Sequence, residues 1–335
     1  MKITLLSILL LGFTLVYGQE KGIPQGTIST QSVNWYSVEE ALALSKANPK
    51  PFLVDVYTDW CGWCKRMEAT TYRDPQVVTY LNQNFYAIKF NAETKDTITY
   101  LGKEYVNRGK THDLAKVFLG RGSSYPTTFF MSDAYTMALN VPGYLKANQL
   151  APFIVYYKEK AYGGSDINAF MKDFADTFEK PIEGGELEFQ SFNDLYQGEK
   201  SHKKKSILVI TSPKSSISTM LVKTILQDSL VAIEVNKRFN VVNLDISSAD
   251  TLYFGKQQLL PTTTVHQGEH FFLSQLPEIV YPSVVVFDEN NNFITVVPQY
   301  MGKEFTKAIT TFFGDDLYKK EGANFQQYYS QWNKK

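Results

Sequence analysis

The stretch FLVDVYTDWCGWCK, residues 52–65, joins a short apolar run to the only two cysteines of the chain, Cys61 and Cys64. The run is rich in β-branched and aromatic residues, which predicts a buried strand. Each cysteine follows a tryptophan, Trp60 or Trp63. Such a pair can be a redox centre, half of a metal site or a structural disulfide, and the rest of the chain bears on this choice.

The composition indicates a protein whose fold is stabilised by its hydrophobic core. Of its 335 residues, 44% are hydrophobic and 14% aromatic, and the length suggests about two domains. Lysine and arginine together number 34, as do aspartate and glutamate. Because positive and negative charges balance, no net positive charge attracts nucleic acid or an anionic membrane. We therefore expect protein or small-thiol partners and no nucleic acid.

The first residues, MKITLLSILLLGFTLVYGQE, predict a signal peptide over residues 1–18, followed by a flexible segment over 19–32. Their apolar run is shorter than the roughly 20 residues that a membrane-spanning helix needs. We therefore expect a periplasmic or secreted protein without stable membrane insertion.

Strand and helix patterns alternate through the first half of the chain. A helix should open at Ser37, because Ser37 and Glu40 have the spacing of a capping box, and His112 should start another. The order ends in two strands and a helix, which predicts an α/β sheet covered on both faces. The expected strands are 33–37, 51–57, 85–93, 125–131 and 138–144, and the last helix is 146–157.

The second half repeats this plan. Residues 124–162 match residues 280–318 without a gap, and Tyr125-Pro126 falls on Tyr281-Pro282. Two copies of one fold explain this, each a central mixed β-sheet flanked by helices. The expected domains are 33–180 and 187–335, each with a helical tail that packs its aromatic residues onto its own domain, and 181–186 is the linker.

The first copy resembles the thioredoxin superfamily in LVDVYTDWCGWCK, in Lys89 within AIKFN, in Tyr125-Pro126-Thr127 and in Gly143. More closely, it resembles exported bacterial thioredoxin-like proteins with a WCGWCK active site. The motifs cover residues 33 to about 157, and the repeat extends the resemblance to a second, cysteine-free domain. The resemblance implies two tandem thioredoxin-like domains and an enzyme, a thiol–disulfide oxidoreductase.

The resemblance also assigns roles to the first copy. Cys61 is expected to be the nucleophile, exposed where a helix begins and with its pKa lowered there, and Cys64 the more buried resolving thiol. Asp55, buried on the preceding strand, should exchange a proton with Cys64 because burial raises the pKa of a carboxyl. Lys89 matches the lysine near that acid and is expected to modulate it.

Client contacts are expected beside the cysteines. The residues implied are Trp60, which should shield the site, Gly62, Trp63, Tyr125 and Pro126. Pro126 matches the cis-proline of the family, and the strand edge that it begins can pair with an extended backbone.

Other uses of the cysteine pair fit poorly. A zinc site would also need His266 and His270, which lie about 200 residues away in the other copy. A structural disulfide closing so short a loop constrains the unfolded chain little. Haem attachment needs a histidine where Lys65 stands. We therefore expect no metal and no cofactor other than the redox-active disulfide of Cys61 and Cys64.

The second copy should be redox-silent. With a one-residue ambiguity in the alignment, its cysteine positions fall on Ser216 and Thr219, and the Asp55 position falls on Ile210. Pro282 retains the proline that faces substrate, which is compatible with holding an extended peptide.

Together these patterns predict an exported thiol–disulfide oxidoreductase that acts on protein substrates, in the reductase direction. It would need a separate redox partner for recycling, because the chain has no third cysteine. The alternatives are a disulfide oxidase or isomerase and a non-enzymatic client-binding module.

Overall fold

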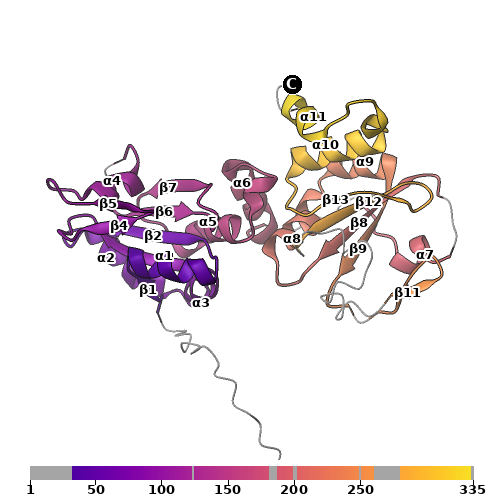
Figure 1. The fold of residues 1–335 in the computed structure, drawn as a ribbon. Coiled ribbons are helices and arrows are strands. Elements are labelled where there is room, and N and C mark those ends of the chain that lie inside the picture. The colour runs from indigo at the N-terminus through magenta and orange to yellow at the C-terminus, as the bar shows by residue number, and fades with distance from the viewer. Residues whose placement is uncertain are drawn as a thin grey trace, which may run out of the picture.

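The computed structural model describes residues 32–122, 124–180, 187–198, 202–248, 250–259 and 280–332. They form two α/β lobes, with helices α5 and α6 between the two sheets (Figure 1). The expected signal peptide, residues 19–31 of the N-terminal segment, the linker 181–186, His266 and His270 lie outside the described residues.

The sheet of the first lobe has five strands in the order β1-β3-β2-β6-β7. β1, β3 and β2 run parallel, whereas β6 is antiparallel to β2 and β7 to β6. Parallel neighbours require a crossover and antiparallel ones only a hairpin, so this order follows from strand–helix alternation that ends in a hairpin. The strands span Trp35–Tyr36 (β1), Phe52–Tyr57 (β2), Tyr86–Asn91 (β3), Thr127–Met131 (β6) and Ala138–Pro142 (β7).

Helices cover both faces of this sheet. One face packs against α1 (Val38–Ala47) and α4 (Asp113–Leu119). The other packs against α2 (Gly62–Ala69), α3 (Pro75–Asn84) and α5 (Ala147–Lys158). Both faces are apolar because β2 is buried on each side, which explains its nearly unbroken run of hydrophobic residues.

Two helix starts follow the sequence prediction. The Ser37 side chain accepts a hydrogen bond from the Glu40 backbone, and the Glu40 carboxylate accepts one from the Ser37 backbone, so the capping box of α1 is complete. His112 caps α4, with its Nδ1 atom accepting from the Leu114 amide at 3.1 Å. These side chains satisfy amides that would otherwise lack a partner in the first turn.

Among the described residues, the second sheet repeats the first without a counterpart of β1. Its order, β13-β12-β8-β9, has the same strand directions as β7-β6-β2-β3. A two-stranded hairpin, which the sequence does not predict, follows β3 in one lobe and β9 in the other. The strands are β8 (Lys205–Thr211), β9 (Phe239–Asp245), β12 (Ser283–Phe287), β13 (Phe293–Val297), and the hairpins β4 (Ile98–Tyr100) with β5 (Lys103–Tyr105) and β10 (Leu252–Phe254) with β11 (Gln257–Leu259).

The helices of the second lobe also cover both faces of their sheet. α7 (Phe192–Tyr196) packs on one face, and α8, α9 and α10 on the other. α8 (Ser216–Met220) continues as a π-helical turn through Leu221–Ile225, and α9 (Ser229–Arg238), α10 (Lys303–Gly314) and α11 (Phe325–Trp332) complete the lobe. Both lobes are thus mixed sheets between helices, as the sequence predicts.

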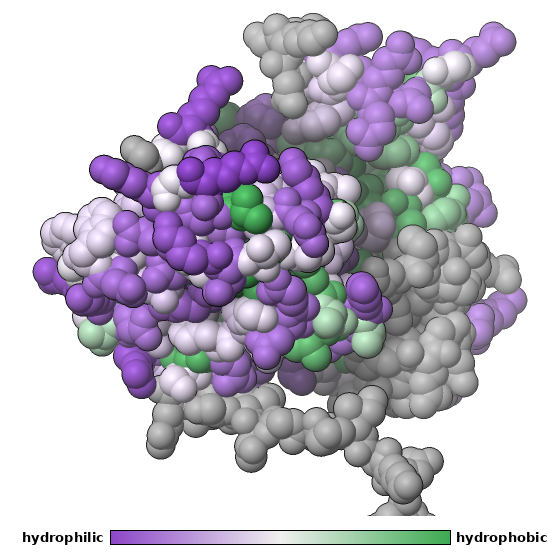
Figure 2. Space-filling view, turned by 60° about the vertical axis from the view of Figure 1, so that its left-hand side comes forward, coloured by the Kyte–Doolittle hydropathy of each residue, from purple (hydrophilic) through white to green (hydrophobic). Residues whose placement is uncertain are grey.

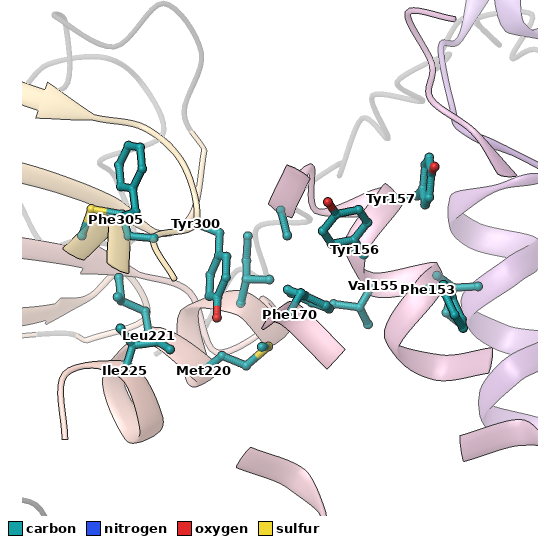
Figure 3. Close-up of a cluster of buried hydrophobic side chains, with 14 of the residues drawn as sticks. Phe153, Val155, Tyr156, Tyr157, Phe170, Met220, Leu221, Ile225, Tyr300 and Phe305 are labelled. Atoms are coloured by element: carbon teal, nitrogen blue, oxygen red, sulfur yellow. The ribbon is translucent and has the colours of Figure 1, made fainter. Parts of the chain in front are cut away.

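The tail of the first lobe lies between the lobes. α6 (Ile167–Phe178) places Phe170 edge-on against Tyr300, with ring centroids 5.5 Å apart (Figure 3). The Tyr300 hydroxyl donates to Asp173 at 3.3 Å. The tail does pack onto its own domain, with the rings of Phe170 and Tyr156 5.1 Å apart, but Phe170 also completes a core that runs into the second lobe, which the sequence does not predict. The tail of the second lobe, α11, does pack onto α10, through Phe325 and its neighbours.

The surface of the first lobe is mainly hydrophilic in the view of Figure 2, with hydrophobic residues in small separate groups. In the part of the chain that the structure describes, no single helix has the length and hydropathy of a membrane span. One pair, Ser216–Ile225 with Ser229–Arg238, reaches both only when taken together, and it is bent by 85°.

Candidate active site

The cysteine pair lies where α2 begins. β2 ends at Tyr57, a short turn follows, and the Cys61 amide donates to the Thr58 carbonyl at 3.1 Å. Cys61 is the N-cap of α2, and its Sγ accepts a hydrogen bond from the Cys64 amide at 3.0 Å. A disulfide joins Cys61 and Cys64. After reduction, the amide and the positive end of the helix would both stabilise a thiolate at Cys61.

The two cysteines are equally buried, each 4% exposed. The expectation of an exposed Cys61 above a more buried Cys64 is therefore wrong for the disulfide form. The bond draws both sulfurs into one environment, so the difference between them lies in position and not in exposure. Cys61 caps the helix, whereas Cys64 stands inside its first turn, on the buried face with Met67.

Asp55 lies under this site, on the central strand β2. Its side chain is on the same face as Leu53, which is the face that α2 covers with Met67. Asp55 is 1% exposed, and no described residue donates a well-aligned hydrogen bond to its carboxyl oxygens. The Lys89 ammonium forms an ion pair with it at 3.1 Å. Burial raises the pKa of Asp55 to about 6, although Lys89 acts to lower it.

Lys89 is not a lysine that reaches freely into solvent. It lies opposite Asp55 in the β2–β3 register and also pairs with Glu68. Its ammonium is about 5 Å from the ring centres of Trp35 and Tyr57, a cation–π arrangement. Burial lowers the pKa of Lys89, but the two carboxylates more than offset this and raise it.

Glu68 is a member of the site that sequence reasoning missed. It follows Cys64 by one helical turn on α2, and its charge acts to raise the pKa of Asp55. Residues four apart on a helix are neighbours on one face, so the spacing of Cys64 and Glu68 could have indicated it. The ion pair itself could not be found from spacing, because it depends on how α2 lies against β3.

Aromatic rings stand around the disulfide. Trp60 is 67% exposed, packs edge-on against Tyr125 and donates from its indole to Glu93 at 3.1 Å. Trp63 is 56% exposed and lies against Tyr144. We call Trp60, Trp63, Tyr125 and Tyr144 the aromatic rim.

Arg66 adds a positive charge to this rim, 5.3 Å from the ring centre of Trp63 and 5.7 Å from that of Tyr144. Gly62, the first residue of α2, leaves open space at its Cβ position. The positive charge beside exposed rings gives the rim two kinds of contact for a polypeptide.

Pro126 precedes β6, and its peptide bond with Tyr125 is cis, the geometry that the resemblance implies. Its carbonyl accepts from the Gly143 amide at 2.8 Å, which closes the β6–β7 ladder at this end. Asp55 lies on β2, Cys61 at the start of the helix that follows β2, and Tyr125 and Pro126 just before β6, the neighbour of β2 in the sheet.

Strand register corrects the alignment of the second copy. Asp55 pairs with Thr128 and Lys89, and the equivalent residue in the second sheet is Val209, which pairs with Val284 and Asn243. The register therefore resolves the one-residue ambiguity of the alignment, and Val209 rather than Ile210 takes the Asp55 position.

The counterparts of the two cysteines in the second copy shift by one residue in the same direction. Ser215 is the N-cap of α8 and its hydroxyl accepts from the Ser218 amide at 3.1 Å, as Cys61 does from Cys64. Ser215 and Ser218, rather than Ser216 and Thr219, take the cysteine positions. The peptide bond before Pro282 is also cis. Among the described residues no group of three or more metal-binding side chains occurs.

Comparisons with known proteins show which proteins this chain is similar to. A family model, Thioredox_DsbH, described as a protein of unknown function (DUF255), matches residues 26–148. The chain is similar to an uncharacterised protein of Caenorhabditis elegans, 30% identical over 96 residues, which are 28% of this chain and 13% of that one. It is also similar to the thiol:disulfide interchange protein DsbD of Vibrio vulnificus, 42% identical over 50 residues, 15% of this chain and 8% of that one.

Among solved structures, a thioredoxin-fold protein from Helicobacter pylori aligns with 16% identity and a TM-score of 0.34, covering 44% of this chain and 96% of that one. The alignments with the two curated relatives span 13% of the length of one and 8% of the other.

A disulfide at the start of a helix, a buried carboxyl on the strand before it and a cis-proline at the start of the neighbouring strand form a site suited to thiol–disulfide exchange. The Thioredox_DsbH match over residues 26–148 falls on the first lobe, so the likeness to the thioredoxin superfamily lies in that lobe.

Proposed function

We propose that this protein is an exported thiol–disulfide oxidoreductase that reduces disulfides in protein clients through Cys61 and Cys64. The observation that carries the proposal is the position of the Cys61 sulfur, which caps α2 and accepts the Cys64 amide hydrogen. A sulfur in that place is poised to exist as a thiolate, which is the reactive form in disulfide exchange.

The reaction needs one attack from each cysteine. The Cys61 thiolate attacks a client disulfide, forms a bond to one client sulfur and expels the other as a thiolate. Cys64 then loses its proton, attacks Cys61 and releases the second client sulfur. The client gains two electrons, and the cysteine pair is oxidised to the disulfide.

Asp55 is suited to take the proton of Cys64. With a pKa of about 6 it is mostly ionised at neutral pH yet close enough to neutrality to return a proton. Lys89 would set how readily Asp55 is protonated, because its positive charge favours the carboxylate. Activity should therefore rise with pH as Asp55 loses its proton.

The aromatic rim favours protein clients over small disulfides. Trp60 and Trp63 expose more than half of their side-chain surface beside the disulfide, and large exposed aromatic side chains often mark recognition surfaces. Export rests on the pattern of residues 1–18 alone. The reduced pair would be regenerated by a separate redox partner, since Cys61 and Cys64 are the only cysteines.

Insulin reduction tests the proposal. Purified protein should accelerate the precipitation of insulin by dithiothreitol, and Cys61→Ala should abolish the acceleration. Glu179→Ala, at an exposed site after α6, is the matched control and should behave as wild type. Wild-type protein that is no faster than Cys61→Ala would refute the activity.

Equilibration with glutathione tests the direction. A reductase should have a potential near the roughly −270 mV of thioredoxin, whereas an oxidase should lie near the roughly −120 mV of DsbA. A value at the oxidising end would replace the reductase by the oxidase or isomerase alternative.

A further inference from the structure

Ser215 occupies, in the second lobe, the place of the attacking cysteine. Both the strand register and the N-cap hydrogen bond match it to Cys61. A hydroxyl cannot carry out disulfide exchange, so this position is free to serve another purpose.

A carboxylate from the first lobe lies against Ser215. Glu159, the residue after α5, accepts hydrogen bonds from the Ser215 hydroxyl at 2.7 Å and from the Ser216 and Ile217 amides at 3.1 and 3.2 Å. Tyr80 of α3 also hydrogen-bonds the Glu159 carboxylate. Hydrogen bonds to a charged acceptor are stronger than neutral ones, so Glu159 ties two elements of the first lobe to the former active site of the second.

The rim of the second copy is covered as well. Tyr300 is the counterpart of Tyr144, which stands beside Trp63 in the aromatic rim of the first lobe. Tyr300 is completely buried, with Phe170 against its ring and Asp173 on its hydroxyl. Both covering residues belong to α6, so the tail of the first lobe lies where a client would lie on a working copy.

Close backbone packing holds the covering segment in place. The Gly302 amide donates to the Gly164 carbonyl at 3.2 Å, and a Cβ atom at Gly164 would lie 1.7 Å from the Tyr300 carbonyl oxygen. This contact is independent of Glu159 and involves other segments, yet it holds the same two lobes against each other.

We propose that the client-binding face of the second lobe is an internal docking site, occupied by Glu159 and α6 of the first lobe, that locks the two lobes into one unit. The second lobe then takes no client at Ser215 and Pro282. The silent copy keeps the fold of a thiol–disulfide exchange domain, but uses its active-site face to bind its neighbour. This inference does not depend on the exchange activity of Cys61.

Burial and hydrogen bonding shift the pKa of Glu159 in opposite directions. Burial raises the pKa of Glu159, whereas the hydrogen bonds from Ser215, Ile217 and Ser216 lower it. Tyr80 also faces the Glu159 carboxylate. A cleft of about 790 Å³ borders the contact, lined by Tyr80, Glu159, Ser215 and Tyr281 among others, so solvent reaches one side of it.

Hydrogen exchange of the full-length protein tests the lock. In Glu159→Ala the Ser216 and Ile217 amides lose their acceptor and should exchange at least about tenfold faster, since a hydrogen bond to a charged group is worth that factor or more. Glu159→Gln should change exchange in the same direction by less. Glu179→Ala, an exposed carboxylate on the same tail, should match wild type, and all variants should retain insulin reduction.

A double-mutant cycle and solution scattering complete the test. Glu159→Ala and Ser215→Ala should be strongly non-additive in stability, because each removes the same contact. The combined variant should also broaden the distance distribution in X-ray scattering. Additive effects, or wild-type exchange at Ser216 and Ile217 in both Glu159 variants, would overturn the proposal.

Discussion

Replacing Asp55 by asparagine should stabilise the oxidised protein at neutral pH. Asp55 is 1% exposed, and burial raises its pKa from 3.8 to about 6 despite the ion pair with Lys89. A carboxyl with a raised pKa in the folded chain contributes stability that is fully present below pH 3.8. That stability is lost as the pH rises through 6, where the buried group ionises.

The magnitude follows from the two pKa values. They differ by 6 − 3.8, or about 2 pKa units, and each unit corresponds to about 1.4 kcal/mol. Ionised Asp55 therefore costs the fold roughly 3 kcal/mol at pH 7 and above. Asparagine has nearly the same shape and no charge to bury, and Lys89 keeps Glu68 as a partner. Most of the roughly 3 kcal/mol should be recovered.

Denaturant unfolding of the oxidised protein at pH 4, 6 and 8 measures this effect. Asp55→Asn should be more stable than wild type by about 3 kcal/mol at pH 8, and by less than about 1 kcal/mol at pH 4. Asp59→Asn, at an exposed carboxylate nearby, is the control and should show neither effect. A variant less stable than wild type at pH 8, or a gain independent of pH, would refute the reasoning.

Three further substitutions test other parts of the structure. Ser37→Ala removes half of the capping box of α1 and should lower the free energy of unfolding by about 1 kcal/mol in the same titration. Gly164→Ala forces a methyl group against the Tyr300 carbonyl and should lower the melting temperature by several degrees, whereas Gly109→Ala, with open space, should not; equal melting temperatures would contradict the close contact. Arg66→Ala removes the charge of the aromatic rim and should raise KM for insulin about two- to fivefold, leaving turnover of a small disulfide unchanged.

Local sequence patterns were sufficient to predict the main elements of the first lobe. The apolar run of β2, the capping box at Ser37 and the spacing of Cys61 and Cys64 each depend on near neighbours in the chain. Asp55 stood out because it is a charge inside an apolar strand, and the structure buries it as expected.

Contacts between segments that are distant in the sequence could not be predicted from such local patterns. The one-residue ambiguity between Ile210 and Val209 as the counterpart of Asp55 could not be resolved from the sequence, because segments of different length separate the repeated strands; the hydrogen-bonded register assigns Val209. The covering role of α6 was missed because an aromatic residue such as Phe170 carries no sign of which lobe it packs against. Glu159 gave no signal either, since its partners lie more than fifty residues away.

Trapping of mixed disulfides tests the central claim most directly. Cys64→Ser removes the resolving thiol, so incubation of this variant with a disulfide-containing protein should accumulate a covalent adduct that dithiothreitol releases. Mass spectrometry should place the bond at Cys61, and Cys61→Ser should form much less adduct. Equal adduct formation by Cys61→Ser, or none with Cys64→Ser, would contradict the assignment of Cys61 as the attacking residue.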